Sequence, residues 1–100
     1  MDEKLLTISD LRKGLEQVIE NDHILSKLEN TSDDELLRAG LYTDLGMDSI
    51  DVWELVCVLE RDHEIYVEDS VEAVLDISVD LTVEIYLNAL NNYQQALPPR

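Results

Sequence analysis

One serine in this chain stands between carboxylates at the predicted start of a helix. The stretch from Asp44 to Val56 reads DLGMDSIDVWELV, with Ser49 between Asp48 and Asp51. If Asp48 is the N-cap, its carboxylate accepts a backbone N–H of the first turn and Ser49 becomes the first helical residue. Its hydroxyl then points outward beside unsatisfied N–H groups and the positive end of the helix dipole. Such a setting tolerates a phosphate ester.

The residue before this turn supports the same interpretation. Gly46 gives the backbone conformational freedom and leaves room for an enzyme to approach the hydroxyl of Ser49. The pattern therefore predicts a serine that another protein can reach and modify. The alternative is an ordinary serine at a helix N-terminus with no chemical role.

Other kinds of chemical site find little support in the sequence. The two histidines, His23 and His63, are far apart, and Cys57 is the only cysteine, so no metal-ligand spacing is present. No glycine-rich phosphate loop appears among three glycines. A Ser-His-Asp hydrolase is disfavoured because no G-x-S-x-G nucleophile elbow occurs.

Negative charge is the strongest global signal. Asp and Glu number 23 against 7 Lys and Arg, for a formal net charge of -16. From Asp44 to Pro99, thirteen acidic residues face the single basic Arg61. This field repels nucleic acids and anionic membranes and attracts basic protein surfaces, so we expect protein partners rich in Lys and Arg. It also opposes self-association, and we expect a monomer. A solvated surface that only aids solubility is the alternative.

The length fits a single domain, which we place at residues 1–97 with a short tail at 98–100. Cys57 has no partner for an internal disulfide, and neither a signal peptide nor a membrane-spanning apolar run is recognisable. We therefore expect a cytoplasmic location.

Apolar residues recur mostly at spacings of three and four, which is typical of helices. We predict an all-α fold, an irregular four-helix bundle with a long loop between the first two long helices and a short third helix. Thr7 and Asp10 form a capping pair for the first helix, whose apolar face comprises Ile8, Leu11, Leu15, Val18 and Ile19.

The long connection is predicted at residues 21–44, with one short helical turn in SDDELLRAG. There Ser32 and Glu35 resemble a capping box and Gly40 a stop signal. The second long helix should cover about 48–62. A short third helix should follow Asp69 or Ser70, with Val71, Val74 and Leu75 inward. The fourth should contain Val83, Tyr86, Leu87, Leu90 and Tyr93 and end before the prolines.

A helical wheel divides the second long helix into two apolar faces. The core face contains Val52, Leu55, Val56 and Leu59. Three further apolar residues, Ile50, Trp53 and Cys57, fall on or near the outward side, rimmed by Asp51, Glu54 and Glu60. This arrangement predicts a partner surface, with apolar groups for affinity and carboxylates for steering. The alternative is that residues 21–44 fold over the stripe and bury it.

The stretch DLGMDSID resembles the attachment motif of acyl carrier proteins, in which the serine of L-G-x-D-S-L is modified. Matches to the family pattern fall at Asp44, Leu45, Gly46, Asp48, Ser49 and Asp51, with Ile50 at the usual leucine. The sequence ELVCVLERDHEIYVED resembles the rest of the family's second helix and the following loop. The resemblance covers roughly Ile8 to Tyr93, and aspartate before the serine favours the fatty-acid and polyketide type over peptide-synthetase carriers.

This resemblance implies that a phosphopantetheinyl transferase attaches 4′-phosphopantetheine from coenzyme A to Ser49, beside Asp48 and Gly46. The arm would hold acyl groups as thioesters for acyl-transfer and chain-elongation enzymes with basic docking surfaces. The carrier itself would catalyse nothing. In this family the acyl chain can retreat between helices, and we expect such a cavity to be lined by Val52, Leu55, Val56, Leu59, Val67, Val71 and Leu75.

Five residues depart from the family pattern: Trp53, Arg61, His63, Tyr66 and, at a frequent proline, Glu68. Two pathway classes stay open for a carrier, type II fatty acid synthesis and a specialised route to polyketides or other secondary lipids. The first, or a related pathway, is our main expectation, and the departures keep the specialised route open as the alternative. A second function class also stays open, an acidic interaction module with a carrier-like fold that is never modified.

Overall fold

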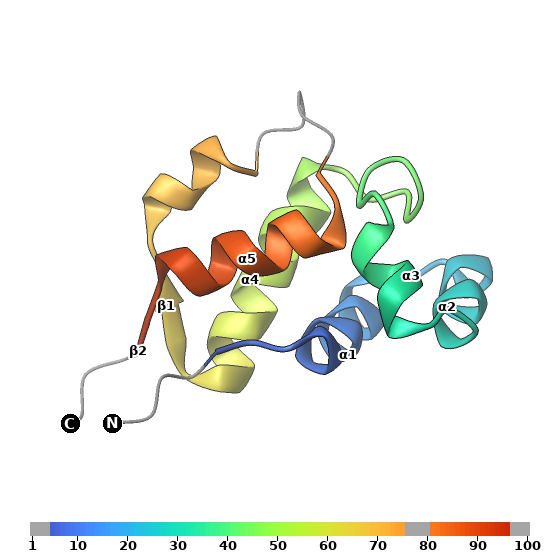
Figure 1. Cartoon of the computed structure of the whole chain (residues 1–100), viewed down its shortest axis with the longest axis horizontal. Coiled ribbons are helices and arrows are strands. Elements are labelled where there is room, and N and C mark those ends of the chain that lie inside the picture. The colour runs from blue at the N-terminus through green and yellow to red at the C-terminus, as the bar shows by residue number, and fades with distance from the viewer. Residues whose placement is uncertain (1–4, 76–80, 97–100) are drawn as a thin grey trace.

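Helices account for most of the folded chain. The computed structural model describes residues 5–75 and 81–96. Its elements are α1 (Ile8–Val18), α2 (Asp22–Glu29), α3 (Asp33–Arg38), α4 (Ser49–His63), β1 (Ile65–Val67), the 3-10 helix η1 (Asp69–Ala73), α5 (Val83–Tyr93) and β2 (Gln94–Ala96). Figure 1 shows their arrangement. The predominance of helix agrees with the predicted all-α class, to which the two short strands are an addition.

The predicted capping residues begin α1 and α4. Thr7 and Asp10 form a reciprocal capping box, in which each side chain accepts the other's backbone N–H. Asp48 and Asp51 do the same for α4. Because each box satisfies two N–H groups that a helix start leaves free, it fixes the first residue of its helix locally.

The prediction of a largely irregular connection at 21–44 is wrong for its first part, which forms α2. The side chain of Asn21 accepts the backbone N–H groups of His23 and Ile24 and thereby caps this helix. Its apolar face is short: Leu28 is fully buried, and Ile24 and Leu25 are partly buried against the core. A face of three residues over eight positions is a weak helix signal in a sequence. The second part agrees with the prediction, since Ser32 caps α3.

The remaining helices lie close to their predicted positions. The fourth predicted helix corresponds to α5, and the third is a 3-10 helix capped without a side-chain hydrogen bond at Glu68. Val71 and Leu75 point into the core as expected, whereas Val74 is partly buried.

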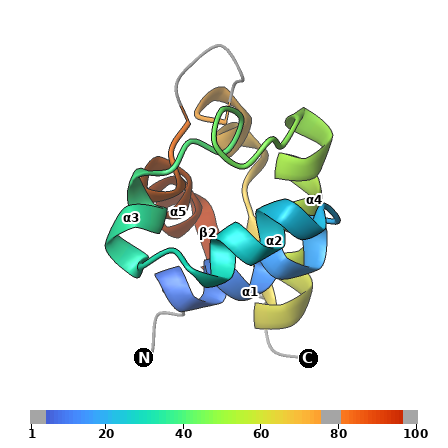
Figure 2. The same cartoon turned by 90° about the vertical axis from the view of Figure 1, so that its right-hand side faces the viewer.

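Helix α1 packs directly on α4 in the centre of the core. A Cβ atom added at Gly14 would lie 2.7 Å from Cδ1 of Leu55, so this glycine permits close approach of the two helices. Figures 1 and 2 agree in placing α2 and α3 at one end of the molecule, beyond α1. The core therefore sits between α1, α4 and α5.

Tyr86 of α5 lies in this core with no exposed surface. Its hydroxyl donates a hydrogen bond of 2.9 Å to the carbonyl oxygen of Val52 in α4. Because Val52 lies three residues after Ser49, α5 anchors the part of α4 that presents the serine.

Strands β1 and β2 pair antiparallel, with Tyr66 opposite Gln95. The backbone N–H of Glu68 extends the ladder by donating to the carbonyl oxygen of Tyr93 at 2.9 Å. Proline, frequent at this position in the family that the sequence resembles, has no N–H to donate. The departure at Glu68 therefore allows the longer pairing between the two segments.

The side chain of Asn91 clasps the segment that leads into α1. Its Oδ1 accepts the backbone N–H of Leu6 at 2.7 Å, and its Nδ2 donates to the carbonyl oxygen of Leu6 at 3.0 Å. Asn91→Ala should therefore lower the free energy of unfolding by about 2 kcal/mol, at roughly 1 kcal/mol for each bond. Urea denaturation followed by circular dichroism measures the change. Asn91→Asp retains only the acceptor and should fall between the two; equal stability of all three proteins would contradict the clasp.

Candidate functional site

Ser49 is the first residue of α4, and its side chain is exposed. On either side of it the capping box holds the backbone, with the Asp51 N–H donating to Asp48 Oδ1 at 2.9 Å and the Asp48 N–H donating to Asp51 Oδ2 at 3.2 Å. Within residues 5–75 and 81–96, no hydrogen bond occupies the Ser49 hydroxyl. An approaching reagent could therefore reach this oxygen without breaking a bond inside the protein.

The loop before Ser49 has a defined shape. Gly46 has a φ of 65°, in the left-handed region that other residues adopt at a cost. A Cβ there would meet nothing within 4 Å, so the backbone conformation alone favours glycine. Asp44 closes the turn by accepting the Gly40 N–H at 2.7 Å, and the buried Leu45 and Met47 anchor the loop in the core.

The predicted partner surface is only partly open. Ile50 is 72% exposed, and Cys57 and Glu54 are exposed, so residues 21–44 do not cover them. Trp53 differs, because it is partly buried and packs against the core. Ile50 and Cys57 therefore form the open apolar part of this face.

Two of the three predicted rim carboxylates also hold the backbone. Asp51 completes the capping box of α4. Glu60, from the last turns of α4, accepts the N–H of Val67 in β1 through its Oε2 atom at 2.8 Å. Of the three, only Glu54 is both exposed and outside these structural contacts.

All of the predicted cavity residues lie in the core, each with 4% or less of its surface exposed: Val52, Leu55, Val56, Leu59, Val67, Val71 and Leu75. Their burial agrees with the inward positions that the sequence predicts for them. Their role in surrounding an acyl chain stays a prediction.

A hollow of about 390 Å³ lies between the α1–α2 corner and the start of α4, and it is lined by Gly46 and Asp51, on either side of Ser49 in the sequence, but not by Ser49 itself. One wall comes from the corner between α1 and α2, with Glu20, Asn21 and Ile24, and the other from Gly46 and Asp51 at the start of α4. Sequence reasoning missed the first wall. Its residues carry no motif, and their position follows only from the packing of the α1–α2 corner against α4.

The departures at the end of α4 have partners on α1. Arg61 donates from Nη2 to Gln17 Oε1 at 3.0 Å and from Nε to Asp62 Oδ1 at 3.1 Å. His63 Nε2 lies 3.9 Å from Asp10 Oδ1. The hydrogen bond from Gln17, and after it the one from Arg61, lowers the pKa of Asp62. These residues join the two central helices and lie at the opposite end of α4 from Ser49.

Within the described ranges, no group of three or more His, Cys, Asp or Glu side chains is arranged to hold a metal ion. The helices in those same ranges also fall short of the length and apolar character that crossing a membrane requires.

Comparison with protein-family models, with curated proteins and with solved structures finds no match to this chain. The residues and geometry of the site are therefore the grounds on which a function is proposed.

Proposed function

We propose that this chain is an acyl carrier protein whose Ser49 is esterified with phosphopantetheine. The observation that carries the proposal is the position of that serine, exposed at the first residue of α4 and framed by the Asp48 cap and the left-handed Gly46. The motif DLGMDSID supplies the family resemblance, and the open hydroxyl is what a modifying enzyme requires.

The surroundings of Ser49 fit a phosphopantetheine group. The hydroxyl is open and the adjoining Gly46 is exposed, so a phosphodiester at this oxygen meets no packed side chain on that side. Once attached, the group supplies a thiol that forms thioesters with acyl groups. The protein's part is to present the arm and to be recognised.

We also propose that the fold is that of an acyl carrier protein. Helices α1, α4, η1 and α5 correspond to an irregular four-helix bundle within one domain, and α2 and α3 occupy the long first connection. Ile50 and Cys57, with Glu54 beside them, form the surface that we propose for acyl-transfer and chain-elongation enzymes. The net charge of -16 favours partners with basic docking surfaces.

Two pathway classes and one non-carrier function are compatible with this site. The departures at Trp53 and Tyr66 keep a specialised carrier open beside one for type II fatty acid synthesis: Tyr66 is exposed on β1, and Trp53 is half-buried against the core on α4. The exposure of Ile50 would equally serve an interaction module that is never modified. Modification of Ser49 separates the carrier from the module.

The proposal predicts an all-or-none result in an intact-mass experiment. After incubation with coenzyme A, magnesium and a broad-specificity phosphopantetheinyl transferase, the protein should gain the mass of one phosphopantetheine group. Ser49→Ala should gain none, because the proposed acceptor oxygen is removed.

A matched control is Ser26→Ala, which removes an exposed helical serine from α2 and should still gain one group. An unchanged mass for the original protein, with the transferase active on a known carrier, would favour the unmodified interaction module. Modification of Ser49→Ala would contradict the assigned attachment point.

A further inference from the structure

Ser49 and Trp53 share one line along α4. The residues at 49, 53, 56 and 60 are separated by four, three and four positions, which places them one above another on a single helix face. Glu60, on this line, binds the N–H of Val67 in β1. The line therefore faces the segment that contains β1 and η1, and Trp53 lies one turn from the serine on that side.

This segment runs back along α4 toward Ser49. Figure 1 shows β1 beside the lower part of α4, with η1 continuing from it toward the upper part. Helix η1 packs closely on α5. The backbone of η1 lies further from α4 than from α5. Its residue Val71, together with Leu75, is buried in the same core cluster as Val52 and Val56 of α4. The seam between α4 and η1 is thus lined by buried apolar side chains from both sides.

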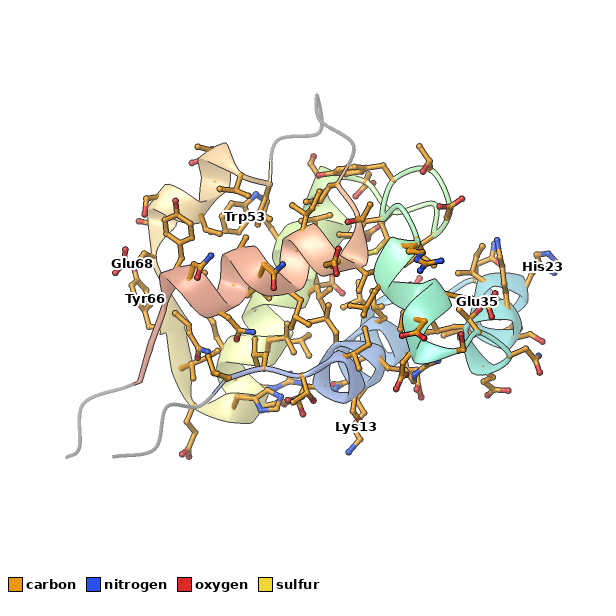
Figure 3. The ribbon with its side chains drawn as sticks, in the orientation of Figure 1. Lys13, His23, Glu35, Trp53, Tyr66 and Glu68 are labelled. Carbon is orange, nitrogen blue, oxygen red and sulfur yellow. The ribbon has the colours of Figure 1, made fainter. Side chains whose placement is uncertain are left out.

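Trp53 is the largest side chain available to close this seam. Figure 3 draws Trp53 between the ribbons of α4 and η1. Its indole is partly buried and packs against the core, while Val56 behind it on the same line is only 2% exposed. A group that extends from Ser49 along this line of α4 therefore meets the indole one turn away.

We propose that Trp53 limits the length of acyl chain that this protein can withdraw from water, which makes it the specificity-determining residue of the carrier. The inference rests on the proposed function. A short acyl group can lie against the exposed part of the indole. A longer chain gains burial only by displacing the indole, and that displacement gives up the apolar contacts the ring already makes. The protein therefore suits short acyl groups.

The test compares the thermal stability of the protein loaded with different acyl groups. A broad-specificity transferase moves the acyl-phosphopantetheine group of butyryl-, octanoyl- or dodecanoyl-coenzyme A to the Ser49 hydroxyl and releases adenosine 3′,5′-bisphosphate. Intact mass establishes the identity of the three acyl forms. A chain that is buried only in the folded state raises the melting temperature relative to the form with a free thiol. In the original protein, octanoyl and dodecanoyl groups should raise it no further than butyryl does.

Trp53→Val removes the indole and should change this pattern. Octanoyl should then raise the melting temperature by about 5 °C or more beyond butyryl, since 1 kcal/mol corresponds to roughly 4–8 °C in a domain of this size. Trp53→Phe, a milder replacement that preserves an aromatic ring, should give an intermediate shift. Ile85→Val is the matched control, because it truncates an exposed apolar residue on α5, outside the proposed partner surface, and should behave like the original protein.

Fluorescence gives a second readout, since Trp53 is the only tryptophan. Its emission should shift when butyryl is attached and change little more with octanoyl. Equal chain-length profiles for the original protein and Trp53→Val would overturn the proposal on Trp53 while leaving the carrier function intact. Failure to add any arm to the original protein would overturn both.

Discussion

Tyr86→Ala is expected to lower the free energy of unfolding by about 4 kcal/mol, because it empties the position of a fully buried aromatic ring between α5 and α4. Tyr86→Phe should cost about 1–2 kcal/mol, the value of the 2.9 Å hydrogen bond to the Val52 carbonyl. Urea denaturation measured by circular dichroism gives both values. The difference in unfolding free energy between the two variants gives the contribution of ring packing, and the loss in Tyr86→Phe gives that of the hydroxyl.

The pH dependence of the unfolding free energy provides the control for Tyr86→Phe. Burial raises the pKa of Tyr86 well above its ordinary value, because the folded protein disfavours the charged phenolate. The folded state therefore retains a proton that the unfolded state loses above about pH 10, and this contribution to stability falls as the pH rises. The stability of Tyr86→Phe should fall less steeply there. Parallel curves for the two proteins would contradict the buried, protonated hydroxyl.

Arg12→Ala should cost about 3 kcal/mol, since hydrogen bonds from a charged donor contribute roughly 1.5–3 kcal/mol each and do not add fully. The Arg12 guanidinium donates to the carbonyl oxygen of Leu28 at 2.7 Å, to that of Thr31 at 2.9 Å and to Asp33 Oδ1 at 2.8 Å. It thus ties the end of α2 and the start of α3 to α1. Denaturation with urea measures the loss.

Hydrogen exchange should locate the effect of Arg12→Ala in residues 22–38, with smaller changes in α4. Arg12→Lys should restore little, because an ammonium group cannot reproduce the planar fork of donors. Lys13→Ala, a change at the exposed neighbouring position, should stay within about 0.5 kcal/mol of the original protein. If Arg12→Ala is no less stable than Lys13→Ala, these bonds do not hold α2 and α3.

Local signals explain why the helix starts could be predicted. The capping boxes of α1 and α4 each involve residues three positions apart, so nothing beyond one turn is needed to form them. The long α4 and α5 also show helical periodicity over several turns. The exposure of Ser49 follows from the same local pattern, because a first-turn side chain next to a capped backbone points outward.

The features that could not be predicted depend on distant parts of the chain. Helix α2 contributes one fully buried residue and is held at its end by Arg12 from α1. Strands β1 and β2 are each three residues long, and α5 lies between them in the sequence. Three residues are too few for an alternation of apolar and polar side chains to indicate a strand. The partial burial of Trp53 likewise depends on tertiary packing. A helical wheel of α4 shows only the residues of that helix and cannot reveal what packs against them.

The hydrogen bond between Glu60 and Val67 also bears on how firmly β1 is held. Glu68 donates toward β2, so Val67, one residue earlier, directs its N–H to the opposite border of β1. Helix α4 lies along that border and Val67 is buried, so without a partner this N–H would lose its hydrogen bond to water and gain none. The Glu60 carboxylate accepts this hydrogen bond and joins the strand to the last turns of α4. A carboxylate predicted for partner recognition thus also seals the edge of the sheet against the helix.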